Sequence, residues 1–227
     1  MPELLAQYPD DILARRAALP VKPAPIVLEG KFVRLEPLDL DRDGEALFQH
    51  SSGDAITLGG RPVPTYDADA VVWRWMFAGP FSSADELREH LQAQVQAANG
   101  LPFTVFDAAS STPVGVANYI NNFPKDLKIE LGSIWYSPIA QRTHANLEAT
   151  YLMLRHAFDL GYLRLEWKCN ALNERSRRSA LRMGFQFEGI QDAHMIVKGR
   201  RRDTAWYRIL ADEWPGVKAH LEGLLAR

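Results

Sequence analysis

The chain has 227 residues, 47% of them hydrophobic and 24% charged, and these proportions are typical of a globular protein. A formal net charge of −2 argues against nucleic-acid binding, and no apolar run is long enough to cross a membrane. The single cysteine excludes an internal disulfide and favours the reducing environment of the cytoplasm.

The first residues differ in pattern from the rest of the chain. Apolar side chains recur at helical spacing over residues 3–18, and the proline-rich segment LPVKPAPIV follows them. We therefore predict that residues 1–30 form a helical extension and a linker. The main domain is expected over residues 31–212, and residues 213–227 are expected to carry a C-terminal helix.

Strand-like and helix-like patterns alternate along the main domain. The predicted elements are a strand over 31–36, a helix over 40–50 capped by Asp39, a helix over 83–98 capped by Ser83, strands over 103–106, 114–121 and 129–136, a helix over 145–160, a strand over 163–169, a helix over 173–183 capped by Asn173, strands over 185–188, 190–197 and 204–210, and a helix over 217–225. This order predicts a mixed α/β (α+β) fold with a mostly antiparallel sheet and one central βαβ crossover.

Residues 51–82 follow no regular pattern. Glycine and proline residues come first, and an aromatic cluster of Trp73, Trp75, Phe77 and Phe81 follows. A long aromatic loop inside a compact domain is usually functional. A helix over 68–78 that buries its tryptophans is an equally good interpretation, and both can hold together.

Residues 132–146 (GSIWYSPIAQRTHAN) are the most informative segment. A strand ends at Tyr136, a turn follows, and Gln141 begins the approach to the helix over 145–160. A strand that passes through a short loop into a helix N-terminus directs several backbone N–H groups at one point, where the helix dipole adds positive charge. This arrangement favours binding of a phosphate-bearing cofactor.

The same segment resembles the cofactor loop of the GNAT superfamily of N-acetyltransferases, which usually reads Gln/Arg-x-x-Gly-x-Gly/Ala. Gln141 matches the first position, whereas His144 and Asn146 stand at the two glycine positions. Downstream, Asn173 and Ser176 followed by GFQFEG at 184–189 resemble the signature of the ribosomal-protein N-acetyltransferase branch. The resemblance covers roughly residues 30–210.

The resemblance implies an acyl-CoA N-acyltransferase fold with helices on both faces of the sheet, and acetyl-CoA as donor with no metal. Pantetheine would hydrogen-bond the backbone of Ile134 and Tyr136, and Asn173 would bind it through its side chain. Ser176 would lie near the thioester sulfur as an acid. The pyrophosphate would contact the loop residues Gln141, Arg142, Thr143, His144, Ala145 and Asn146. Helix capping is the alternative role for Asn173 and Ser176.

A carboxylate that reaches the amine could act as the general base. Glu130 lies eleven residues before Gln141, where several family members have a glutamate with this role. Strand alternation predicts that Glu130, Ile134 and Tyr136 share one face. The alternative is an ordinary outward-facing carboxylate. The sequence departs from the family at Ala180, where many members have a tyrosine, and at Met195, where some have a glutamate.

Other segments support less chemistry. Cys169 is predicted to be a core residue, and the histidines show no metal-ligand spacing. The run KGRRRD at 198–203 is predicted to be a solvated hairpin turn, although its arginines could meet an acidic substrate.

The sequence thus predicts a cytoplasmic N-acetyltransferase that acts on a primary amine, either a small molecule or a peptide N-terminus. Trp73, Trp75, Phe77 and Phe81 are expected to shape the acceptor pocket, with at least one facing the acetyl group. No membrane or nucleic-acid partner is expected, and a homodimer is compatible with the sequence. The alternatives are a CoA-binding regulatory protein with little catalysis and an enzyme that uses a longer acyl-CoA.

Overall fold

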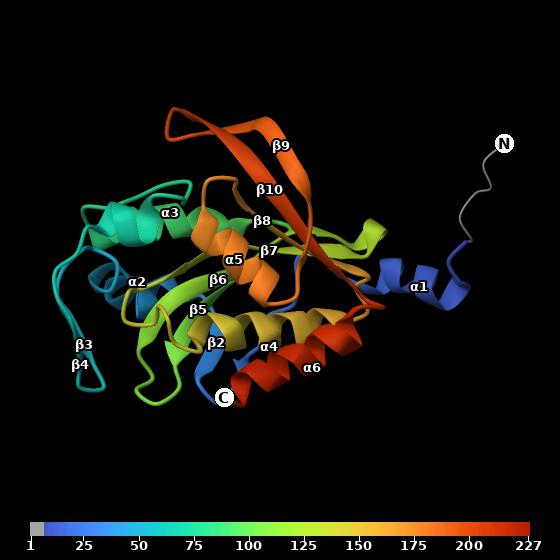
Figure 1. The fold of residues 1–227 in the computed structure, drawn as a ribbon, viewed down its shortest axis with the longest axis horizontal. Coiled ribbons are helices and arrows are strands. Elements are labelled where there is room, and N and C mark those ends of the chain that lie inside the picture. Colours follow the sequence, from blue (N-terminus) through green and yellow to red (C-terminus); the bar gives the residue numbers. More distant parts are fainter. Residues whose placement is uncertain (1–6) are drawn as a thin grey trace.

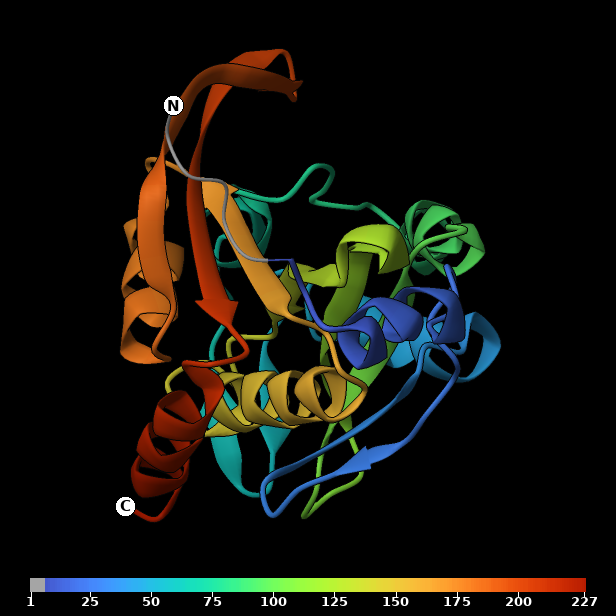
Figure 2. The ribbon, with the colours of Figure 1, turned by 90° about the vertical axis from the view of Figure 1, so that its right-hand side faces the viewer.

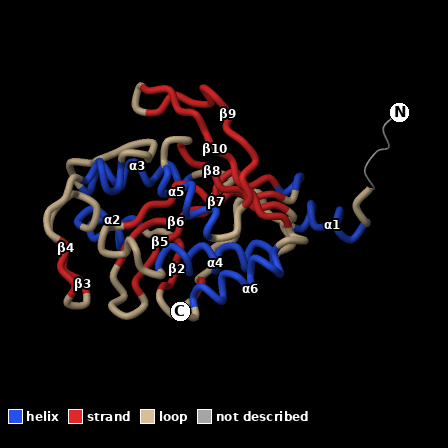
Figure 3. Tube along the Cα trace, viewed as in Figure 1, coloured by secondary structure: helices blue, strands red, loops and turns tan. Residues whose placement is uncertain are grey.

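The structure is a computed structural model that describes residues 7–227. One eight-stranded sheet forms its centre (Figures 1 and 3). Its strands are β1 (Leu28–Glu29), β2 (Val33–Pro37), β5 (Leu101–Asp107), β6 (Pro113–Phe123), β7 (Lys128–Tyr136), β8 (Arg164–Asn170), β9 (Gln186–Val197) and β10 (Arg200–Leu210). Their order is β1-β2-β5-β6-β7-β8-β10-β9. Within the described residues β7 and β8 are parallel and the other neighbours are antiparallel, as the sequence predicts.

Helices cover both faces of the sheet (Figure 2). On one face lie α4 (Ala145–Asp159), which makes the crossover between β7 and β8, and α6 (Trp214–Leu225), which packs on it. The other face carries α2 (Leu40–Gln49), α3 (Ala84–Gln96) and the π-helix η1 (Asp69–Trp73). α5 (Glu174–Arg182) contacts β8 and β9, and α1 (Asp10–Ala18) contacts the 3₁₀ turn η2 (Pro124–Asp126).

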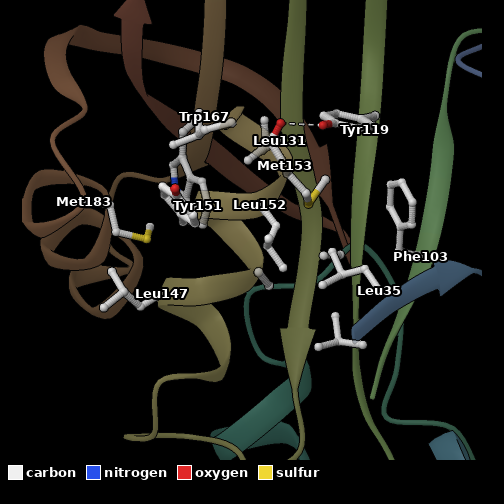
Figure 4. Packing of buried hydrophobic residues seen from close by; sticks show 14 of the residues in the cluster. Leu35, Phe103, Tyr119, Leu131, Leu147, Tyr151, Leu152, Met153, Trp167 and Met183 are labelled. Atoms are coloured by element: carbon white, nitrogen blue, oxygen red, sulfur yellow. Dashed lines mark hydrogen bonds between the residues drawn. The ribbon is translucent and has the colours of Figure 1, made fainter. Parts of the chain in front are cut away.

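The helices α2, α3, α4 and α5 begin within one residue of the predicted positions, whereas α6, predicted from residue 217, begins at Trp214. Asp39 accepts the amides of Asp41 and Arg42, and Ser83 accepts the amide of Glu86. α4 is apolar nearly all round and is correspondingly buried, with Leu152 and Met153 directed toward the sheet and Leu147 beside Met183, which follows α5 (Figure 4).

Tertiary contacts change the prediction in three regions. A small hairpin, β3 (Ile56–Leu58) with β4 (Arg61–Val63), occupies part of the segment predicted to be irregular. The helix over 68–78 is shortened to the π-helix η1. Two predicted strands merge into β9, because its pairing with β10 continues through a register shift beside Gly189.

The N-terminal segment lies against the main domain. Lys22 Nζ donates hydrogen bonds to the carbonyls of Val95 (2.6 Å) and Ala97 (2.9 Å), and β1 pairs with β2. The predicted helix over 3–18 begins at Asp10, and its residues 3–6 lie outside the described part. The division of the chain at residues 30 and 212 stays a prediction. No helix within residues 7–227 is long and apolar enough to cross a membrane.

Candidate active site

The sheet opens between its two parallel strands. The pairing of β7 with β8 runs from Lys128–Arg164 to Leu131–Trp167 and then stops, so that the facing edges beyond this point have no ladder partner within residues 7–227. β8 continues to pair with β10 on its other side. A gap with free strand edges on both sides is therefore built into the sheet, beside Ile134 and Tyr136, whose backbone the family resemblance assigns to pantetheine.

A pocket of about 70 Å³ fills this gap, and we call it the central pocket. Its wall contains both strand edges, the start of α5, the segment after η1, and one residue of β10. The lining residues are Trp75, Met76, Phe77, Leu131, Gly132, Ser133, Ile134, Trp167, Lys168, Cys169, Asn170, Asn173, Ser176 and Arg202. Asn173, predicted to bind pantetheine, and Ser176, predicted to lie near the thioester sulfur, both line this pocket, whereas Glu130, the predicted base, does not.

A β-bulge in β7 overturns the prediction that Glu130, Ile134 and Tyr136 share a face. Ser133 has a left-handed φ of 49°, and the register with β6 shifts at this point. Ile134 and Tyr136 pack in the same core as Ile129, on the α4 side of the sheet. Glu130 is the next residue after Ile129 and points to the opposite side. The extra residue of the bulge inverts the alternation that the prediction assumed.

Glu130 is 4% exposed and is held by two donors. Its Oε2 accepts from Asn121 Nδ2 (2.7 Å) and from Lys168 Nζ (2.8 Å). Lys168 also binds Glu166 at 3.0 Å and lies over the Trp206 ring. The second carboxylate oxygen of Glu130 lies toward the pocket wall, because a Cβ placed on Gly132 would be 3.3 Å from it.

The loop that leads into α4 presents free amides. Within residues 7–227 no hydrogen-bond acceptor meets the backbone N–H of Arg142, His144, Asn146 or Leu147. Arg142 has a left-handed φ of 62°, which turns the chain sharply before the helix. Four unpaired donors at a helix N-terminus fit the diphosphate of CoA.

Side chains of the loop hold its shape. Gln141 Nε2 donates to the carbonyls of Val71 (3.2 Å) and Tyr136 (3.0 Å). Thr143 Oγ1 donates to Ala140 O (2.6 Å) and accepts from the amide of Ala145 (3.1 Å). The first predicted cofactor residue, Gln141, therefore positions the loop in this structure.

His144 lies at a family glycine position without distorting the loop. Its φ is −75°, so no glycine-like conformation is needed there. Its ring stacks on Phe32 with the ring centroids 4.4 Å apart and the planes 13° apart. The ring packs on the segment before β2.

Replacing His144 with glycine should leave the affinity for acetyl-CoA unchanged or slightly higher, because the loop amides do not depend on the ring. We expect the Kd from calorimetry to stay within about threefold of the wild-type value, a change of less than about 0.7 kcal/mol. Thermal unfolding should show a small loss from the missing stack on Phe32. A loss of affinity beyond tenfold would identify the imidazole as a ligand of the cofactor.

Asn146 and Asn173 each make one structural contact. Asn146 Nδ2 donates to Ser179 Oγ (3.0 Å), while its Oδ1 is buried and has no donor within residues 7–227. Asn173 Oδ1 caps α5 by accepting the amide of Ser176 (3.2 Å). The capping interpretation thus describes Asn173 Oδ1, and its Nδ2 remains available to a ligand in the central pocket.

Ser176 and Cys169 lie on adjacent walls of the pocket. Ser176 Oγ accepts from Trp167 Nε1 (3.0 Å), and its hydroxyl lies close enough to the Cys169 thiol to interact with it. Cys169 belongs to the core, as predicted, and burial raises the pKa of its thiol.

The aromatic cluster divides between core and pocket. Trp73 is 1% exposed, donates from Nε1 to Ser51 O (2.9 Å), and packs on Phe81. Trp75 and Phe77 line the central pocket. The acceptor role of the cluster stays a prediction for Trp75 and Phe77, while Trp73 and Phe81 are placed as core residues.

Two pocket cations were not expected from the sequence. Lys168 alternates with core residues on β8, a pattern that could have indicated its direction. Arg202 belongs to the run predicted to be a solvated turn, and that prediction is wrong for this residue, because it is buried on β10. Arg200 and Arg201 are exposed as predicted.

Comparisons with known proteins agree with this geometry. Residues 35–186 match the family described as "Acetyltransferase (GNAT) domain". A GCN5-related N-acetyltransferase from Brucella melitensis is 38% identical with a TM-score of 0.79, over 89% of this chain and 86% of that one. A protein described as a probable GNAT-family acetyltransferase from Chromobacterium violaceum ATCC 12472 is 32% identical with a TM-score of 0.77, over 95% and 96%.

More distant structures share the fold. RimL, described as a ribosomal L7/L12 alpha-N-protein acetyltransferase, is 18% identical with a TM-score of 0.66, over 82% of this chain and 94% of that one. At this identity the likeness concerns the fold alone. A comparison with curated proteins found no match.

Proposed function

This chain belongs to the GNAT family of N-acetyltransferases, and on that premise we propose that it transfers the acetyl group of acetyl-CoA to a primary amine of a small molecule or a peptide N-terminus in a ternary complex. The family implies acetyl-CoA as the donor and an amine as the acceptor. The observation that carries the proposal is the gap between β7 and β8, which holds the central pocket, together with the free amides of the loop that leads from β7 into α4.

The residues present fit this donor. The amides of Arg142, His144 and Asn146 would hold its diphosphate, and the free edges of β7 and β8 would pair with the amides of its pantetheine arm. When bound, acetyl-CoA supplies an activated thioester for direct attack by the amine.

The protein side of the chemistry needs a proton acceptor, a donor and a fixed acceptor amine. Glu130 would take a proton from the amine through a water beside Gly132, and Ser176 would donate its hydroxyl hydrogen toward the leaving sulfur. Trp75 and Phe77 would exclude bulk water and position the amine. Positioning alone can supply much of the rate for an activated donor.

Calorimetry with acetyl-CoA, dephospho-CoA and desulfo-CoA tests the cofactor assignment, and release of free thiol with a panel of amines tests the reaction. We expect acetyl-CoA to bind and the analogues to bind more weakly. At least one amine class should be acetylated. Absence of binding at millimolar CoA would contradict the cofactor assignment, and binding without turnover of any amine would favour a regulatory CoA-binding protein.

A further inference from the structure

Arg202 is a buried arginine at the wall of the central pocket. It is 7% exposed and its guanidinium lies 4.9 Å from the centroid of the Phe77 ring. The ring covers one face of the planar group, and such stacking leaves the N–H donors at the edge of the plane free. Arg202 therefore presents donors toward the pocket and not toward solvent.

No residue within 7–227 forms a hydrogen bond or an ion pair with the Arg202 side chain, and its Nε is buried without an acceptor. Burial lowers the pKa of its guanidinium from the ordinary value, yet arginine stays protonated at neutral pH. A buried cation without a partner is costly to the fold. An anion in the pocket would therefore supply the acceptor that Nε lacks.

The nearby carboxylates are already occupied. Glu130 binds Lys168 and Asn121, and Glu166 binds Lys168 and Arg164. Both glutamates thus contact Lys168, and neither forms a hydrogen bond or an ion pair with Arg202. The charge of Glu130 acts on the Arg202 guanidinium without a hydrogen bond to it, and Nε of Arg202 is left without an acceptor, so that a carboxylate entering the pocket would meet a free donor.

The hairpin that carries Arg202 is fixed over the pocket. Lys198, at its tip, donates to the carbonyl of Trp73 (2.8 Å) and lies 3.9 Å from Asp69. This contact joins the β9–β10 hairpin to η1, and the segment after η1 brings Phe77 to Arg202. The anion site is therefore part of the same enclosure as the proposed thioester position.

We propose that Arg202 binds a carboxylate of the acceptor, an inference that rests on the proposed acetyl transfer. The acceptor class is then a small amine that carries a carboxylate close to the amine, as an amino acid does, and not a peptide N-terminus. The planar guanidinium matches a carboxylate through two parallel hydrogen bonds, which fixes the amine relative to the thioester.

Matched substrates test this assignment. A panel of amino acids is assayed with acetyl-CoA, each acid beside its primary amide and its decarboxylated amine. The wild-type kcat/KM should favour the acid by about 10- to 100-fold, in line with a buried hydrogen-bonded charge pair. Arg202→Gln should abolish this preference, mainly through KM, and Arg202→Lys should retain part of it. Arg200→Gln, exposed on the same hairpin, should behave as wild type.

A binding measurement separates this proposal from the reaction itself. In the presence of CoA, calorimetry compares an N-acetyl amino acid with its N-acetyl amide on the wild type and on Arg202→Gln, after thermal unfolding and CoA affinity confirm that the variant is folded. If the N-acetyl amino acid binds the wild type but not Arg202→Gln, the anion site is supported. Absence of acetylation of every amine would contradict only the proposed function, and not the anion site. If the wild type acetylates acids, amides and peptides with equal kcat/KM, the proposed anion site is overturned, while the proposed acetyl transfer is supported.

Discussion

Replacing Glu130 with glutamine should lower kcat for amine acetylation by roughly 10²-fold or more at neutral pH, because the substitution keeps the shape and removes the proposed base. The affinity for acetyl-CoA should stay within about twofold, since Glu130 does not line the central pocket. Steady-state kinetics and calorimetry measure the two quantities separately. The loss should shrink at high pH, where more of the amine is already deprotonated.

Glu130→Gln removes both the proposed base and the ion pair with Lys168, so a control variant must distinguish these two effects. Glu166→Gln removes the other carboxylate that binds Lys168, at 3.0 Å. Although burial by itself raises the pKa of Glu166, the hydrogen bonds from Arg164 and Lys168 hold that pKa below its ordinary value, so this carboxylate is a poor base. Glu166→Gln should therefore lower kcat far less. Unchanged kcat in Glu130→Gln, or equal losses in both variants, would assign Glu130 a structural role.

Replacing Glu148 with alanine should destabilise the protein by about 3–5 kcal/mol, because three backbone donors would lose their acceptor at once. Glu148 is 5% exposed, and its carboxylate accepts the amides of Lys31 (2.8 Å), Phe32 (2.6 Å) and Val33 (2.8 Å). These bonds join α4 to the start of β2. Thermal unfolding should show a fall in Tm of roughly 10 °C for a domain of this size.

Two further variants interpret this result. Glu148→Gln should also be strongly destabilising, because the side-chain NH2 group would replace one carboxylate oxygen and face backbone N–H donors that need an acceptor. Glu174→Ala removes an exposed carboxylate paired with Arg178 at 3.7 Å, and such surface pairs contribute less than about 0.5 kcal/mol. A Glu148→Ala variant within about 1 kcal/mol of wild type would show that water replaces the carboxylate at these amides.

Local signals account for the parts of the structure that could be predicted. Asp39, Ser83 and Asn173 cap helices through amides two or three residues away, so that a few adjacent residues of the sequence are enough to predict each cap. The glutamine of the loop and the GFQFEG segment gave the family, which the comparisons confirm. The family in turn implied the opening between β7 and β8.

The direction of several site residues depended on contacts distant in the chain. Strand alternation placed Glu130 beside Ile134, but the bulge at Ser133 inverts that relation, and the only local signal of this bulge was Gly132 inside the predicted strand. The run of charged residues at 198–203 looked solvated, yet Phe77 and the tie between Lys198 and Trp73 enclose Arg202.

The sequence by itself therefore determined most of the elements, several helix caps and the family, since hydrophobic periodicity and capping act over a few residues. The tertiary structure alone decided which side of the sheet Glu130 occupies, that His144 stacks on Phe32, and that Arg202 lacks a partner in the central pocket. These outcomes are set by which segments meet in space, and the burial and charge balance of a site exist only once those segments have packed together.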